Sequence, residues 1–195
     1  GRRLAKFVRS DGTVVGYDQT RRFDFSQWPI NELTDLERLL RRLRDHADRA
    51  VLRGRPIGDG REARRLLRHD PATGEGPTII DVPHRWVALD VDAAPRPDHV
   101  AIQDLEACAA AVFPLLPEGF HRASCLVQAT GSHGFKPGAR LRLWFWLNRP
   151  AGGTELRAWL ADAPIDSSVF GAAQIIYTAR PSLERGLVDP CPERL

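Results

Sequence analysis

The chain has 195 residues, with 28 lysine and arginine against 25 aspartate and glutamate side chains and a net charge of +3. This length suffices for one domain with a sizeable hydrophobic core, or for two small subdomains, without covalent or metal staples. Its three cysteines, Cys108, Cys125 and Cys191, are widely spaced and include no Cys-x-x-Cys pair, which argues against a disulfide framework and a structural zinc site.

No apolar run approaches the length of a membrane span, and Gly1-Arg2-Arg3 lacks the apolar core of a signal peptide. We therefore expect a cytoplasmic protein that has no membrane partner. Because the chain begins with Gly1 rather than Met, we also expect it to be a piece of a larger protein.

Taken in chain order, the first elements predicted are a hairpin and a helix. Residues 6–15 read as two strands around the turn Ser10-Asp11-Gly12. Four leucines between residues 33 and 43 recur at helical spacing and predict an amphipathic helix over residues 31–47, capped by Thr34 or by Asn31. Next come a short strand at 50–57, a short basic helix at 60–68 and a loop at 70–77.

Positive charge is concentrated in residues 36–68, which contain eleven arginines and five acidic residues. Such an excess is typical of a surface that faces phosphates, although an ordinary solvated helix face explains it equally well. On the first interpretation, we predict nucleic-acid contacts from Arg38, Arg41, Arg42, Arg64 and Arg65.

The second half of the chain alternates predicted strands and helices. One helix is expected to begin at a cap on Asp98 and to end at Pro117-Glu118-Gly119, and a shorter one to span residues 154–161. The predicted strands are 86–92, 123–130, 141–147 and 174–179.

The most informative stretch is the apolar run 86–92, which ends in Asp90 and Asp92. Because strand side chains alternate between faces, these two carboxylates share one face and lie roughly 7 Å apart. Burying unpaired carboxylates beside apolar surface is costly, so the spacing favours a bound divalent cation. The alternative is a strand that simply emerges into a loop at Asp90.

A glycine-rich basic stretch, residues 130–142, lies between two predicted strands. Small residues let the backbone approach a ligand closely, and hydroxyl, imidazole and cationic groups are the donors that a triphosphate needs. Taken alone, such a stretch is more often a solvated turn, but here it lies one strand downstream of the paired carboxylates. The candidate donors are Ser132, His133, Lys136 and Arg142.

Asp166 is a third candidate carboxylate from a different element. Two metal ions about 3.5 to 4 Å apart need several bridging oxygens, which three carboxylates can supply. Taken alone, an aspartate before Ser167-Ser168 is instead typical of a turn or a helix cap.

These motifs occur in a recognisable order. Leu89-Asp90-Val91-Asp92, then Gly131-Ser132-His133, then Ile165-Asp166 resembles the three motifs of the archaeo-eukaryotic primases, the primase-polymerase superfamily. The tail, residues 166–170 with 174–181, is similar to that of primases from bacterial plasmids, phages and integrated mobile elements. The resemblance covers residues 80–182.

The resemblance implies an α+β fold with a mixed or antiparallel, RNA-recognition-like sheet, and template-directed primer synthesis. It implies that Asp90, Asp92 and Asp166 hold two Mg²⁺ or Mn²⁺ ions. It also implies that the second motif binds the incoming NTP or dNTP, and we add Arg180 of the tail to these nucleotide contacts. In many members the motif histidine lies on the strand after the glycine turn, near Arg142 in this chain, which leaves open which of His133, Lys136 and Arg142 contacts the phosphate.

We expect residues 1–78 to form a basic α/β subdomain and residues 79–195 the catalytic core, integrated into one primase domain. The expected partners are a single-stranded DNA template, nucleoside triphosphates and a helicase domain or separate helicase, because the chain has no Walker-type phosphate loop of its own. Two alternatives remain: a metal-dependent glycosyltransferase that uses Asp-x-Asp, and a non-catalytic module that binds single-stranded nucleic acid.

Overall fold

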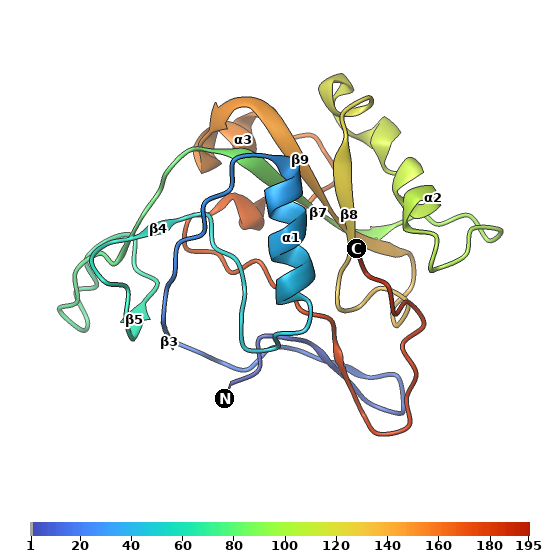
Figure 1. Cartoon of the computed structure of the whole chain (residues 1–195), viewed down its shortest axis with the longest axis horizontal. Coiled ribbons are helices and arrows are strands. Elements are labelled where there is room, and N and C mark those ends of the chain that lie inside the picture. The colour runs from blue at the N-terminus through green and yellow to red at the C-terminus, as the bar shows by residue number, and fades with distance from the viewer. Residues whose placement is uncertain (1) are drawn as a thin grey trace.

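The computed structural model describes residues 2–195 and has a mixed α+β architecture (Figure 1). The fold class is therefore as predicted at this coarse level. The central element is an antiparallel sheet of three strands in the order β7-β9-β8. Its strands are β7 (His84–Ala94), β8 (Cys125–Ala129) and β9 (Ala139–Ala151), which confirms three of the predicted strands.

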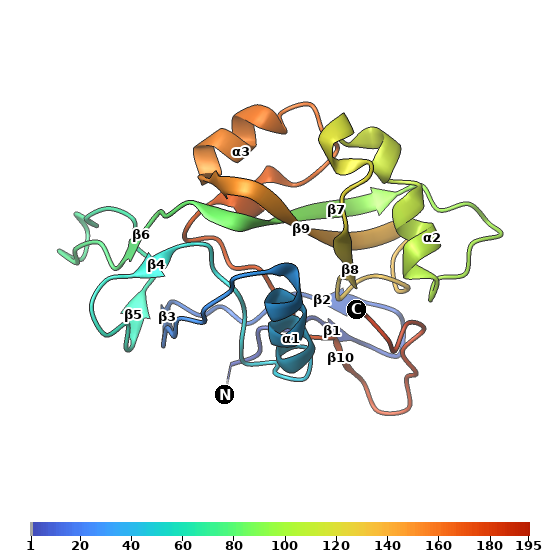
Figure 2. The same ribbon diagram turned by 45° about the horizontal axis from the view of Figure 1, so that its top comes forward.

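Both faces of this sheet are covered, as Figure 2 shows. On one side lie α3 (Gly153–Trp159) and the 3₁₀ turns η1 (Phe113–Leu115) and η2 (Glu118–Phe120). There the ring of Phe120 packs edge-on against Phe145 of β9, with ring centres 4.8 Å apart. Coverage on both faces explains why Val87, Ala88 and Leu89 are all buried along β7.

Helix α2 (Leu105–Ala110) is shorter than predicted and is capped by Asp104, whose carboxylate accepts a hydrogen bond from the Ala107 amide at 2.9 Å. The expected cap at Asp98 was therefore wrong. Residues 98–104 form turns instead. By residue type, Asp98 and Asp104 are equally good N-caps, and the packing of the segment decides which of them caps the helix.

The opposite face of the central sheet is covered by α1 (Leu33–Leu43) and a small sheet in the order β10-β1-β2. Strands β1 (Phe7–Val8) and β2 (Val14–Val15) form the predicted hairpin, and β10 (Ser182–Leu183) pairs in parallel with β1. The leucine stripe of α1 is buried as expected. Its N-cap is Glu32, however, rather than Thr34 or Asn31.

Two other predictions for the N-terminal half were only partly right. Residues 60–68 are not helical: β5 (Ala63–Arg64) pairs with β3 (Arg22–Phe23), and Glu62 adopts a positive φ of 44° that interrupts any helix. Within 50–57, only β4 (Arg55–Pro56) is a strand, paired with β6 (Ile79–Ile80). Residues 70–77 form the predicted loop.

Residues 174–179 do not form the predicted strand and make one isolated bridge, Ile176 to Val51. The reason lies in side chains of the central sheet. Arg142 donates to the carbonyl of Tyr177 at 2.5 Å, and Gln128 donates to that of Thr178 at 3.0 Å. Side chains thus take the backbone groups that a neighbouring strand would have used.

Contacts between residues 2–78 and residues 79–195 join the two expected parts of the chain. The guanidinium of Arg53, which is only 1% exposed, donates to the carbonyls of Trp86 and Ala151 at 2.9 Å each. Burial lowers the pKa of Arg53 to about 10. Within residues 2–195, no helix has the length and apolar character needed to cross a bilayer.

Candidate active site

Four polar side chains form a row across the central sheet. Asp90 of β7 lies opposite Arg142 of β9, and Arg142 lies opposite Gln128 of β8. On the outer side of β7, Asp166 forms an isolated antiparallel bridge with Asp90, and its amide donates to the Asp90 carbonyl at 2.9 Å. Directly opposed residues project their side chains to the same face. Two of the three predicted carboxylates are therefore neighbours, although they are 76 positions apart in the sequence.

Arg142 and Asp90 form a buried ion pair. Nη2 of Arg142 lies 2.7 Å from Oδ2 of Asp90, and the two side chains are 6% and 15% exposed. The second carboxylate oxygen, Oδ1 of Asp90, is buried without a hydrogen-bond partner among the described residues. A buried acceptor without a donor is rare in folded proteins and is satisfied equally well by a cation.

Asp92 lies where β7 becomes irregular. The pairing of β7 with β9 shifts between Val91 and Ala94, and Ala93 has a positive φ of 59°, which identifies a β-bulge. The Asp92 side chain is 62% exposed, and its Oδ1 lies 3.2 Å from Nη1 of Arg140. The bulge thus turns Asp92 toward solvent beside the row.

Gly138 makes this bulge possible from the other strand. Its φ is +76°, and a Cβ built on it would lie 2.9 Å from the carbonyl oxygen of Ala94. Only glycine combines that backbone conformation with so close an approach. The glycine in the predicted loop therefore shapes the strand that carries Asp92.

The carboxylate of Asp166 caps the 3₁₀ turn η3 (Ser167–Phe170). It accepts hydrogen bonds from the amide of Ser168 at 2.9 Å and from its hydroxyl at 2.8 Å. The cap that the sequence offered as an alternative is thus present, on a residue whose backbone is bridged to Asp90.

Within residues 2–195, no three His, Cys, Asp or Glu side chains converge into a preformed metal-binding group. The geometry gives a reason, because each predicted ligand is engaged by a different donor. Asp90 pairs with Arg142, Asp92 with Arg140, and Asp166 with Ser168. Each of these carboxylates is thus oriented by its own donor.

His133 is fully buried, and both of its ring nitrogens bond to the backbone. Nε2 lies 2.8 Å from the carbonyl of Ile102, and Nδ1 accepts from the amide of Arg140 at 3.1 Å. This pattern requires the neutral ring, and burial lowers the pKa of His133 accordingly. The imidazole holds the 130–142 loop and has no ring nitrogen left for a phosphate.

The other predicted donors of this loop lie closer to the carboxylates. Ser132 is buried, and its hydroxyl accepts a hydrogen bond from Nζ of Lys6 at 3.0 Å. Burial lowers the pKa of Lys6, and the charge of Asp92 partly opposes that shift. Lys136, which is exposed, also acts on Lys6 electrostatically and so lies nearby.

Two residues of this region were not predicted, Lys6 and Tyr17. Lys6 and Lys136 are the only lysines in the sequence, but nothing in the sequence places Lys6 beside the 130–142 loop. Tyr17 stacks on Tyr177, with ring centres 3.3 Å apart and planes inclined by 6°. Burial raises its pKa, and Arg142 and Asp90 are close enough to modify that shift. Nothing local in the sequence places Tyr17 there.

The remaining predicted residues lie elsewhere. Arg180 pairs with Asp45 at 2.8 Å, and its amide donates to the carbonyl of Arg44, which holds it against the end of α1. On α1, Arg38 and Arg41 form ion pairs within the helix, with Asp35 and Glu37.

Three further arginines of the predicted nucleic-acid set also have partners. The guanidinium of Arg42 lies 4.9 Å from the ring centre of Trp28. Arg64 pairs with Glu75 and Asp70, and Arg65 donates to the carbonyl of Ala173. The two arginines of the β5 region are therefore separate from the exposed face of α1.

The chain matches no protein-family model, no curated protein and no solved structure. The candidate site therefore depends on its own geometry and on the order of its motifs.

Proposed function

We propose that this chain is a template-directed nucleotidyltransferase of the primase-polymerase type. The observation that supports the proposal best is the row on the central sheet. It brings Asp166 beside Asp90 and sets Arg142 directly opposite, with Asp92 at the adjoining bulge. Aspartates from two separate segments and an arginine from a third thus lie side by side.

The residues present fit a pair of divalent cations. Carboxylate oxygens are the ligands that Mg²⁺ and Mn²⁺ prefer, and Oδ1 of Asp90 is a buried acceptor that lacks a donor. When bound, such ions lower the pKa of an attacking hydroxyl and neutralise the charge of a triphosphate and its leaving pyrophosphate.

The side chains around the carboxylates have two roles in this proposal. Lys6, Lys136 and Arg140 place positive charge beside Asp92, where they bind the phosphates of an NTP or dNTP. Arg142 neutralises Asp90 in this structure, and it would offer its guanidinium to the triphosphate if a cation took its place beside Asp90. His133 and Ser132 act indirectly, because they hold the loop and Lys6 in place.

The biological setting is proposed on the same basis. The enzyme would make primers on single-stranded DNA during replication of a plasmid, phage or other mobile element in the cytoplasm. A helicase in another domain or protein would supply the single strand. A glycosyltransferase that uses Asp90 and Asp92 would leave the bridge between Asp90 and Asp166 without a role.

The test is incorporation of labelled nucleotide by the purified chain. Incorporation should require both a single-stranded template and Mg²⁺ or Mn²⁺, and Asp92→Asn should abolish it. Asp162→Asn is the matched control, because Asp162 is exposed and lies outside the row. Equal incorporation by the Asp92 and Asp162 variants at saturating metal would reject the proposal.

A further inference from the structure

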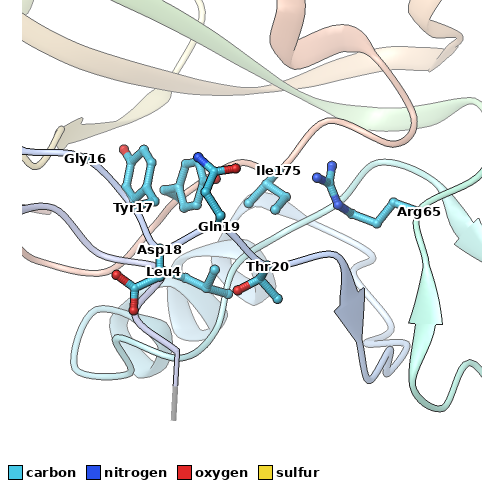
Figure 3. A pocket seen from close by; sticks show the side chains of 9 residues that line it. Leu4, Gly16, Tyr17, Asp18, Gln19, Thr20, Arg65 and Ile175 are labelled. Atoms are coloured by element: carbon cyan, nitrogen blue, oxygen red, sulfur yellow. The ribbon is translucent and has the colours of Figure 1, made fainter.

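Two adjoining cavities lie on the side of the central sheet that carries Asp90. The first, of about 320 Å³, is lined by Tyr17 at one end and by Arg65 at the other, with Ile175 between them (Figure 3). Tyr177, which stacks on Tyr17, also lines it. The second is wider, about 710 Å³, and is lined largely by arginines. Gln19 and Thr20 line both cavities, so the two adjoin, and we refer to them together as the groove.

The inner end of this groove is aromatic and lies near the candidate active site. Tyr17 and Tyr177 are stacked, and the Tyr177 carbonyl accepts a hydrogen bond from Arg142, the ion-pair partner of Asp90. Aromatic side chains near a positively charged groove are typical of sites for unpaired bases, because every base has a face that stacks. A duplex keeps its bases stacked inside, so it offers no such face.

The outer end is strongly basic. Four arginines line it against a single acid, Glu75: they are Arg2, Arg21, Arg22 and Arg64. Arg21 is exposed, and within residues 2–195 its side chain forms no hydrogen bond or ion pair. It is therefore available to an anionic ligand.

Arg22 and Arg64 provide the most specific observation. They lie directly opposite each other on β3 and β5, where like charges destabilise a sheet unless an anion lies between them. Glu75 supplies that anion: its Oε2 lies 2.7 Å from Arg64, and its Oε1 accepts from Arg22. Asp70 also pairs with Arg64, at 2.7 Å. A carboxylate of the 70–77 loop thus occupies a position suited to a phosphate.

A buried polar atom at the junction lacks a partner as well. The hydroxyl of Thr20, which lines both cavities, has no hydrogen-bond partner among the described residues. Such an atom is satisfied by a ligand with hydrogen-bonding groups, such as a sugar or a phosphate.

We propose that this groove binds single-stranded nucleic acid, with an unpaired base at the Tyr17–Tyr177 stack and backbone phosphates at Arg21, Arg22 and Arg64. A phosphate competes with Glu75 for the two opposed arginines. The proposal deepens the proposed function, since it leads a template strand toward Asp90. It differs from contacts on α1, whose Arg38 and Arg41 are already paired within their helix.

The experiment measures binding of fluorescent oligothymidylate by anisotropy, without divalent metal or nucleotide, at several salt concentrations. Arg21→Ala and Arg22→Ala should each weaken binding severalfold and reduce the slope of log affinity against log salt by about 0.7. Tyr17→Ala should weaken binding with little change in slope, because stacking involves no phosphate. Arg21 is exposed and unpaired, so its variant reports on the groove even if another variant unfolds.

Matched controls separate the groove from total charge. Glu75→Gln should tighten binding more than Glu37→Gln, which removes the same charge from the exposed ion pair with Arg41. Arg41→Ala should leave the slope unchanged. Equal gains from the two glutamate variants, or a slope that falls for Arg41→Ala and not for Arg21→Ala, would overturn the proposal.

The two proposals can fail separately. If the groove variants bind like wild type while incorporation still depends on Asp92, the groove is wrong and the proposed function stands. If the groove variants behave as expected and no incorporation occurs, the chain binds single strands without the proposed catalysis.

Discussion

Replacing Asp90 by alanine tests the central ion pair. From sequence alone, Asp90 and Asp92 are two carboxylates that repel each other without metal, so their removal should relieve strain. The structure indicates the opposite for Asp90, because Arg142 pairs with it at 2.7 Å in a buried position. Asp90→Ala would leave the guanidinium buried with the Tyr177 carbonyl as its remaining partner.

Removing one partner of a buried ion pair costs about 3 to 5 kcal/mol. The lower end applies here, since Asp90 keeps 15% exposure and Arg142 keeps one hydrogen bond. For a chain of this length each kcal/mol lowers Tm by about 2 to 4 °C, so Asp90→Ala should lower Tm by roughly 6 to 12 °C. Asp92→Ala should cost less than about 1 kcal/mol, because its partner Arg140 holds it at the surface.

The assay is thermal unfolding of both variants in metal-free buffer with a chelator. The double variant Asp90→Ala, Arg142→Leu should recover part of the lost stability, because it removes the unpaired charge as well. Equal Tm values for Asp90→Ala and Asp92→Ala would refute the ion pair as an energetic feature of the fold.

Three further predictions concern the loop between β8 and β9. Gly138→Ala should destabilise the protein by about 1 to 3 kcal/mol more than Gly12→Ala, since both glycines have positive φ but only Gly138 is crowded; equal losses in urea denaturation would contradict this. His133 is buried with a lowered pKa, so the unfolded chain binds this proton first, and below pH 6.5 His133 should lower the free energy of unfolding by at most about 1.4 kcal/mol per pH unit, in addition to the contribution of His84, whose pKa burial also lowers. Urea denaturation between pH 5 and 7.5 checks this slope, which should become shallower in His133→Asn; an unchanged slope would show that other groups cause it. Lys6→Ala should raise the nucleotide KM more than His133→Asn does. The reverse order in nucleotide titrations would indicate that His133, and not Lys6, contacts the phosphate.

Local sequence pattern was sufficient to predict the elements that bury a regular set of apolar residues. The leucine spacing of α1 and the apolar runs of β7 and β9 predicted these elements, because the same packing that stabilises them sets these patterns. Residues 60–68 were mispredicted because Arg64 pairs with Arg22, a partner 42 positions away that no local rule identifies.

In the site, too, local sequence identified some of the residues, whereas their contacts depend on the fold. Asp90, Asp92 and Asp166 were selected by residue type and spacing, and the structure brings Asp166 beside Asp90. The ion pair with Arg142 depends on strand register, and the burial of His133 depends on the carbonyl of Ile102, 31 positions away. Neither relation is encoded in a short motif.

The most direct test of the proposed enzyme is a crystal of the protein grown with Mn²⁺ and a nucleoside triphosphate, with data collected at the manganese edge. We expect anomalous peaks coordinated by Asp90, Asp92 and Asp166, with the Arg142 guanidinium turned from Asp90 toward the triphosphate. Manganese and nucleotide bound at another surface, with the Asp90–Arg142 pair intact, would contradict this expectation.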